Sequence, residues 1–157
     1  MSHILQLLKK EKKLTDHAIQ SLENYMREWN EDGYHSVLDC NLITETEIAD
    51  ILSKELRIDR VYHLSAQMIE GPALQALPFS KAVEFCSIPI RFLGQNSEKI
   101  EIAIADPTNG QVVSDIELLT GKKAVLVVTE LKSIKNVIHE VYPIEQQIPS
   151  LMAQNKG

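Results

Sequence analysis

The sequence predicts an α+β fold in which a helical subdomain is followed by a small sheet with packed helices. Through residue 57, apolar residues recur at the three- and four-residue spacing of amphipathic helices. From residue 88 onward, β-rich runs alternate with turn residues and helical segments in the order β-β-α-β-α. We expect these strands to form a three-stranded, largely antiparallel sheet. The expected divisions are a helical subdomain at 1–58, an α/β subdomain at 59–142 and a linker or tail at 143–157.

The first two helices are predicted from two apolar stripes. The first stripe runs from residue 4 and breaks near residues 12–13, where lysines cluster. The second, longer helix runs to Trp29, with Thr15 or Asp16 as its N-cap. We expect this helix to end at Gly33, because glycine readily adopts the left-handed conformation that often stops a helix.

Two further helices follow. A short one contains Val37 and Leu38, and the next starts at a capping box formed by Thr44 and Glu47. In such a box the Thr44 hydroxyl accepts a hydrogen bond from the Glu47 N–H, while the Glu47 carboxylate reaches back toward the start of the helix. The apolar face of this fourth helix is Ile48, Ile51, Leu52 and Leu56.

The helical subdomain also contains a faint internal repeat with an offset of 29 residues. Each unit is a short helix, a turn centred on threonine, and a longer helix. The aligned pairs include Leu8 with Val37, Thr15 with Thr44, Ile19 with Ile48 and Leu22 with Ile51.

The α/β subdomain is predicted to hold three strands between helices, and residues 60–64 are a further candidate for a short strand. Residues 94–98 suit a hairpin loop. The expected elements are helical segments at 71–77 and 78–86, strands at 88–93 and 99–105, a helix at 111–119, a strand at 123–128 and a closing amphipathic helix at 130–142.

The stretch IAIADPTNGQVVSDIELLTG (102–121) has some features of a phosphate-binding loop. A P-loop requires a glycine five residues before its Gly-Lys pair and a serine or threonine after it, but these positions hold Ile116 and Lys123. We therefore interpret the stretch as a turn followed by a helix with a glycine stop. The residues of this structural turn and stop are Asp106, Pro107, Gly110 and Gly121.

Composition excludes several classes of function. A net charge of −6 gives no electrostatic basis for nucleic-acid binding. No apolar run approaches the roughly 20 residues of a membrane span. Cys40 and Cys86 make neither a disulfide framework nor a metal cluster, and the five histidines are scattered. With no catalytic motif in view, we expect a cytoplasmic protein that has no enzyme activity, no cofactor and no metal.

Residues 88–142 carry a more specific pattern. It consists of a Pro-Ile strand, an Ala-x-Ala-Asp-Pro strand end, an Asp-Ile helix, a Leu-Thr-Gly stop, a Val-rich strand and an Ile-rich helix ending in tyrosine. This pattern resembles the N-terminal domain of type II secretion and type IV pilus assembly ATPases, and NLITETEIADILSKEL (41–56) resembles a helix pair of the same domain.

The resemblance implies a non-catalytic docking domain that contacts other components of a secretion or pilus system at the cytoplasmic face of the inner membrane. In that family the domain precedes an ATPase motor. The present sequence has no Walker motif, and it is either a fragment cut before the motor or a stand-alone adaptor.

Some members of the family bind cyclic di-GMP through two tandem helix-pair motifs, and the 29-residue repeat places both copies here. The arginine positions of the motif hold His3 and Asp32, and an aspartate repels a dianionic dinucleotide. Docking is therefore our leading hypothesis, and cyclic di-GMP sensing is the alternative. In that alternative the resemblance assigns the ligand to His3, Ile4, Leu8, Ile19, Val37, Ile48 and Leu52.

Overall fold

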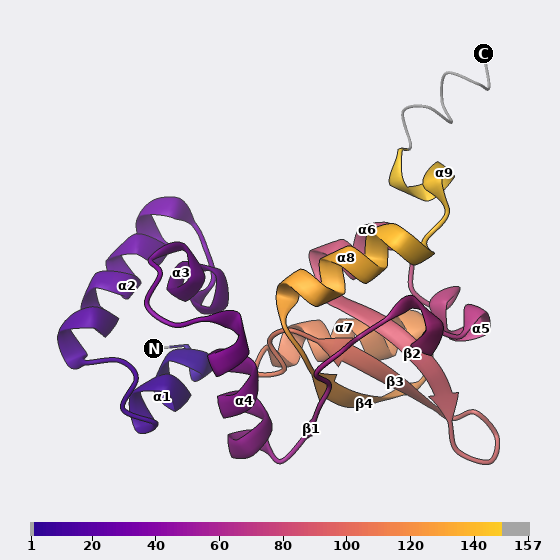
Figure 1. The fold of residues 1–157 in the computed structure, drawn as a ribbon, viewed down its shortest axis with the longest axis horizontal. Helices are drawn as coiled ribbons and strands as arrows, with labels where there is room; N and C mark the ends of the chain where they lie inside the picture. Colours follow the sequence, from indigo (N-terminus) through magenta and orange to yellow (C-terminus); the bar gives the residue numbers. More distant parts are fainter. Residues whose placement is uncertain (1, 149–157) are drawn as a thin grey trace.

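The structure is a computed structural model that describes residues 2–148. A helical half (residues 2–58) lies beside an α/β half (residues 59–148), as Figure 1 shows. Among the described residues, none of the helices combines the length and the apolar character needed to cross a membrane. The helices of the helical half are α1 (His3–Lys10), α2 (Asp16–Trp29), α3 (Gly33–Asp39) and α4 (Glu45–Leu56).

The two units of the 29-residue repeat correspond to two helix pairs, α1 with α2 and α3 with α4. The longer helix of each pair starts at an equivalent threonine. Thr15 Oγ1 accepts the Ala18 N–H at 3.1 Å, and Thr44 Oγ1 accepts the Glu47 N–H at 3.2 Å. At Thr44 the hydroxyl also donates to Glu47 Oε1 at 3.1 Å, so the glutamate reaches back to the hydroxyl.

The prediction that Gly33 ends α2 is wrong. Asn30 ends that helix with φ 51°, and Gly33 is the first residue of α3, whose N-cap is Asp32. A Cβ atom at Gly33 would lie 2.6 Å from Ser2 Oγ and 2.9 Å from Ile4 Cγ2. Glycine is therefore required here by the close approach of the start of α1, and asparagine tolerates the left-handed position.

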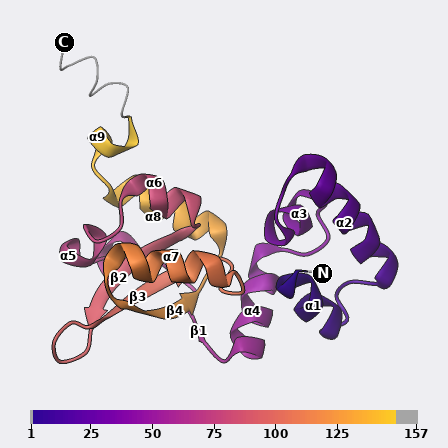
Figure 2. The same cartoon turned by 180° about the vertical axis from the view of Figure 1, so that it is seen from behind.

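The α/β half contains a sheet with helices packed around it. Seen from behind in Figure 2, α7 covers the near side of the sheet and α6 and α8 lie beyond it. The elements are β1 (Asp59–Arg60), a 3-10 turn η1 (Ala66–Met68), α5 (Gly71–Leu74), α6 (Phe79–Glu84), β2 (Ser87–Leu93), β3 (Lys99–Ile104), α7 (Gly110–Thr120), β4 (Lys123–Val128), α8 (Leu131–Val141) and α9 (Ile144–Gln147).

The α+β class is confirmed, but the predicted sheet needs a correction. Within residues 2–148, the sheet has four strands in the order β1-β4-β3-β2, and only the β2–β3 pair is antiparallel. The β3–β4 and β1–β4 pairs are parallel. The reason is α7, which carries the chain back across the sheet, so that β4 starts from the same end as β3. β1 is only two residues long and gains its place by pairing Asp59 with Val127.

Both halves contribute to one continuous apolar core. In β3, Ile100, Ile102 and Ile104 are at most 1% exposed, as the alternating pattern predicted. The predicted buried face of the closing helix is confirmed, with Val141 only partly buried. Its fully buried members are Leu131, Ile134, Val137 and Ile138.

The start of the predicted linker is folded onto the α/β half. Gln146 Oε1 accepts the Phe79 N–H at 3.2 Å, and Gln147 Nε2 donates to the carbonyl oxygen of Tyr142 at 2.7 Å. Residues 149–157, the rest of the predicted tail, lie outside the described residues.

A buried arginine joins the two halves. The Arg60 side chain is 5% exposed, and its Nε donates to Asp50 Oδ1 of α4 at 2.9 Å. The same guanidinium binds the Glu130 carboxylate directly before α8. Burial would raise the pKa of Glu130, but the hydrogen bond from Arg60 lowers it overall. The planar guanidinium, with several fixed donors, therefore sets how α4 sits against α8.

We predict that Arg60→Met lowers the free energy of unfolding by about 3 kcal/mol, because it leaves the carboxylates of Asp50 and Glu130 without their cationic partner. Arg91→Met is the matched control. Arg91 forms a 3.0 Å ion pair with Glu101, but its side chain is 49% exposed, and we expect a loss of less than about 1 kcal/mol. Urea unfolding of both variants measures the difference, and equal losses would contradict the role given to Arg60.

Candidate binding cleft between the two halves

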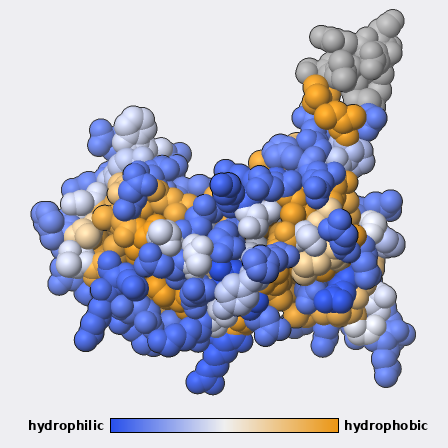
Figure 3. All heavy atoms as spheres, in the orientation of Figure 1, coloured by the Kyte–Doolittle hydropathy of each residue, from blue (hydrophilic) through white to orange (hydrophobic). Residues whose placement is uncertain are grey.

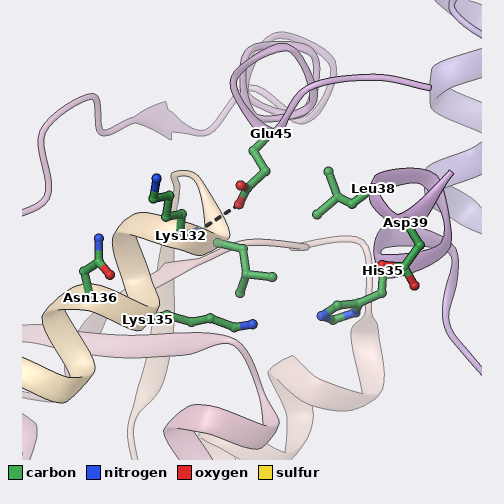
Figure 4. Close-up of a pocket in the computed structure, with 8 residues that line it drawn as sticks. His35, Leu38, Asp39, Glu45, Lys132, Lys135 and Asn136 are labelled. Carbon is green, nitrogen blue, oxygen red and sulfur yellow. Dashed lines mark hydrogen bonds between the residues drawn. The ribbon is translucent and has the colours of Figure 1, made fainter. Parts of the chain in front are cut away.

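A cleft of about 360 Å³ opens where α3 and the start of α4 face α8. Figure 4 shows its lining, with the side chains of the helical half on one wall and those of α8 on the other. The lining residues are His35, Leu38, Asp39, Glu45, Leu131, Lys132, Lys135 and Asn136.

A helix cap crosses between the two halves beside the cleft. Glu45 Oε1, in the first turn of α4, accepts the backbone N–H of Lys132 at 2.9 Å, as marked in Figure 4. Glu130, the residue before α8, makes no side-chain cap of its own for that helix. The carboxylate of Glu45 therefore satisfies a free N–H at the positive end of α8.

His35, on α3, lies on the wall formed by the helical half. Its Nδ1 lies 2.9 Å from both carboxylate oxygens of Asp32, and its Nε2 lies 3.9 Å from Cys86 Sγ across the joint between the halves. The hydrogen bond to Asp32, followed by that to Cys86, raises the pKa of His35 to about 10. Burial would raise the pKa of Asp32, but the hydrogen bond from His35 lowers it overall. At neutral pH the pair is therefore an imidazolium beside a carboxylate.

The charges of the cleft are mixed in sign but unequally engaged. Glu45 is bound to α8, and Asp39 accepts a hydrogen bond from Tyr25 at 3.1 Å. Lys132 and Lys135 both line the cleft, and in Figure 4 Lys135 extends toward the His35 ring, whereas the Lys132 side chain points away from it. Such a lining suits a small polar or anionic group above an apolar floor of leucines.

The seven residues assigned to the cyclic di-GMP alternative do not lie in this cleft. His3 is the exposed first residue of α1. The six apolar residues share the core of the helical half and are at most 3% exposed. These are Ile4, Leu8, Ile19, Val37, Ile48 and Leu52. The structure thus brings them together as packing partners.

Of the four predicted turn residues, Asp106 lies close to His35. Asp106 Oδ1 accepts the Thr108 N–H at 3.0 Å, and burial raises the pKa of Asp106. Pro107 follows within this turn, Gly110 opens α7, and Gly121 ends it at φ 68°. A small hollow of about 50 Å³ separates Asp106 from His35 and Cys86.

The residues that define the cleft were not found from the sequence. His35 follows the N-cap Asp32 by three residues, a spacing that indicates a local contact but not a site. Lys132 and Lys135 belong to the polar face of an amphipathic helix, which is normally solvated. No local pattern shows that this face meets α3 and α4.

Known proteins match this chain in sequence and in fold. A family model, the MshEN domain, matches residues 58–148. The type IV pilus assembly ATPase PilB of Myxococcus xanthus (strain DK1622) is 24% identical over 128 residues, covering 80% of this chain and 22% of PilB. The chain thus spans about a fifth of that relative.

Solved structures show the same fold. An N-terminal domain of XpsE superposes with a TM-score of 0.71 at 20% identity, covering 89% of this chain and 94% of that domain. A structure of MshE with cdg (cyclic di-GMP) superposes with a TM-score of 0.68 at 14% identity, covering 90% of this chain and all of that one.

The fold is that of the N-terminal, non-motor domains of type II secretion and type IV pilus ATPases. The family model covers more than half of the sequence, and the chain belongs to the MshEN domain family. The resemblance seen in residues 88–142 is confirmed.

The His35–Asp32 pair predicts a pH dependence of stability. Because the folded pKa of His35 is raised from 6.5 to about 10, its stabilisation is complete below about pH 6.5 and is lost as the pH rises toward 10. We expect the unfolding free energy of the wild type to fall over this range relative to His35→Gln, as measured by urea unfolding at several pH values. Parallel profiles for the two proteins would contradict the pairing.

Proposed function

We propose that this chain is a non-catalytic docking domain of a type II secretion or type IV pilus ATPase-like system. It positions a motor, or a regulator of one, against a protein partner at the cytoplasmic face of the inner membrane. Membership of the MshEN domain family supports the assignment to a secretion or pilus system. The exposed surface of the domain supports the docking role.

The observation that carries the proposal is the set of large apolar side chains that the fold leaves exposed on both halves. Trp29, the only tryptophan, is 66% exposed, and Leu118 on α7 is 82% exposed. Figure 3 shows apolar surface reaching solvent over the helical half and again over the α/β half. Contiguous exposed apolar patches mark protein interfaces, and aromatic side chains are enriched in them. The exposed set is Trp29, Leu42, Tyr62, Val83, Leu118, Leu119, Ile144 and Ile148.

We expect the full chain to co-purify with at least one identified cytoplasmic or inner-membrane component of such a system from its own source. Tagged chain is the bait, and mass spectrometry identifies the components retained. A bait of the same chain unfolded in urea and adsorbed to the same resin controls for nonspecific capture. Retention of no secretion or pilus component would overturn the docking proposal.

Cyclic di-GMP sensing is the second candidate, supported by the two equivalent helix pairs and by the shared fold with MshE. We expect calorimetry of the full chain to give no heat with cyclic di-GMP at high micromolar concentration. The reason is that the apolar residues of the repeat are buried and the arginine positions hold His3 and Asp32. Saturable heat, absent with GMP, would make the helical half a sensor.

A further inference from the structure

An apolar groove of about 460 Å³ lies along α2, on the helical half. Its floor is Leu22, which is 1% exposed, and Leu42, on the loop after α3, is 45% exposed on the far side. Ala18, Tyr25 and Cys40 complete the apolar lining. We call this surface the α2 groove.

The apolar lining continues beyond the groove along one side of α2. Ala18, Leu22, Tyr25 and Trp29 follow one another at intervals of four, three and four residues, which places them on one helix face. The rings of Tyr25 and Trp29 are 6.1 Å apart. In Figure 3 apolar surface is exposed over this part of the helical half. The result is an elongated track with an aromatic end.

The aromatic end of the track is acidic. The Tyr25 hydroxyl donates to Asp39 Oδ2 at 3.1 Å, and a hydrogen bond with Asp39 raises the pKa of Glu31. Two carboxylates are therefore held together beside the apolar track. Within residues 2–148, no lysine or arginine forms an ion pair with either of them, although Asp39 also lines the cleft that contains Lys132 and Lys135.

We propose that the α2 groove is the docking site for a basic amphipathic helix of the protein partner. This inference rests on the proposed docking function and names the surface and the chemistry of the partner. Such a helix places apolar residues at i, i+3 or i+4, and i+7 on the track. Its lysine or arginine side chains meet Asp39 and Glu31 at the aromatic end. The 14 residues of α2 span about 21 Å, which matches roughly four turns of partner helix.

Charge decides between this occupant and others. A second copy of the chain carries the same carboxylates and the same net charge of −6, so like charges meet at the rim. An anionic membrane surface or a cyclic dinucleotide is repelled for the same reason. A basic helix gains from both the apolar track and the acidic end.

The test is a titration of the full ¹⁵N-labelled chain with an 18-residue helical peptide of leucine and lysine. The same peptide with glutamate in place of lysine is the matched control. We expect amide shifts concentrated in α2 and residues 40–42, a blue shift of the single tryptophan, Trp29, and at least tenfold weaker binding of the glutamate peptide. Shifts centred elsewhere, or equal binding of both peptides, would overturn the proposal.

Variants make the test specific to the groove. Leu42→Ser and Asp39→Asn should each weaken the binding of the lysine peptide about tenfold, whereas Gln95→Ser, in the exposed loop between β2 and β3, should leave its Kd unchanged. Circular dichroism confirms that each variant is folded. Wild-type affinity in Leu42→Ser would contradict the site. Concentration-dependent shifts in α2 without peptide, or sedimentation with anionic vesicles, would assign the groove to a second copy or to lipid and overturn the proposal.

The two proposals fail in different ways. If a secretion or pilus component is retained by Leu42→Ser but lost with Leu118→Ser, docking stands and the α2 groove is not its surface. If wild type retains no component but binds the lysine peptide in the groove, the groove stands and the proposed system is wrong.

Discussion

The arrangement of this domain depends on the buried guanidinium of Arg60. It lies in a two-residue strand and reaches Asp50 on α4 and Glu130 before α8 at once. A buried charge is costly unless all of its donors find partners, so the guanidinium fixes α4 and the start of α8 in one relative position. Glu45 then lies where it can cap α8, and the binding cleft takes its shape between α3 and α8.

The two helix pairs show how one scaffold offers different surfaces. The repeat puts its apolar residues into a shared core, where Ile4 and Ile48 are at most 2% exposed. Residues used for packing in this way are not at the surface to contact a ligand. What the repeat leaves outside differs between its copies, because α2 carries Tyr25 and Trp29 on its outer side. The α2 groove is therefore a property of one copy and not of the repeat.

Local signals predicted much of the fold. The threonine caps at Thr15 and Thr44, the glycine stop at Gly121 and the alternation in β3 each depend on neighbours within about four residues. The errors arose where distant segments meet. Glycine is required at position 33 by the close approach of the start of α1, and it does not end α2. Strand β4 is parallel to β3 because α7 carries the chain back across the sheet. The cleft was missed for the same reason, since its walls come from residues about 100 positions apart.

The sequence by itself determined the class of fold, the order of the helices, three of the strands and the family, because periodicity, caps and the 88–142 motif are written in short stretches of chain. Only the tertiary structure decided the fourth strand, the joint at Arg60, the pairing of His35 with Asp32 and Cys86, and the position of the cleft. These features depend on burial and on charges brought together across the fold, and such distances have no counterpart in local sequence.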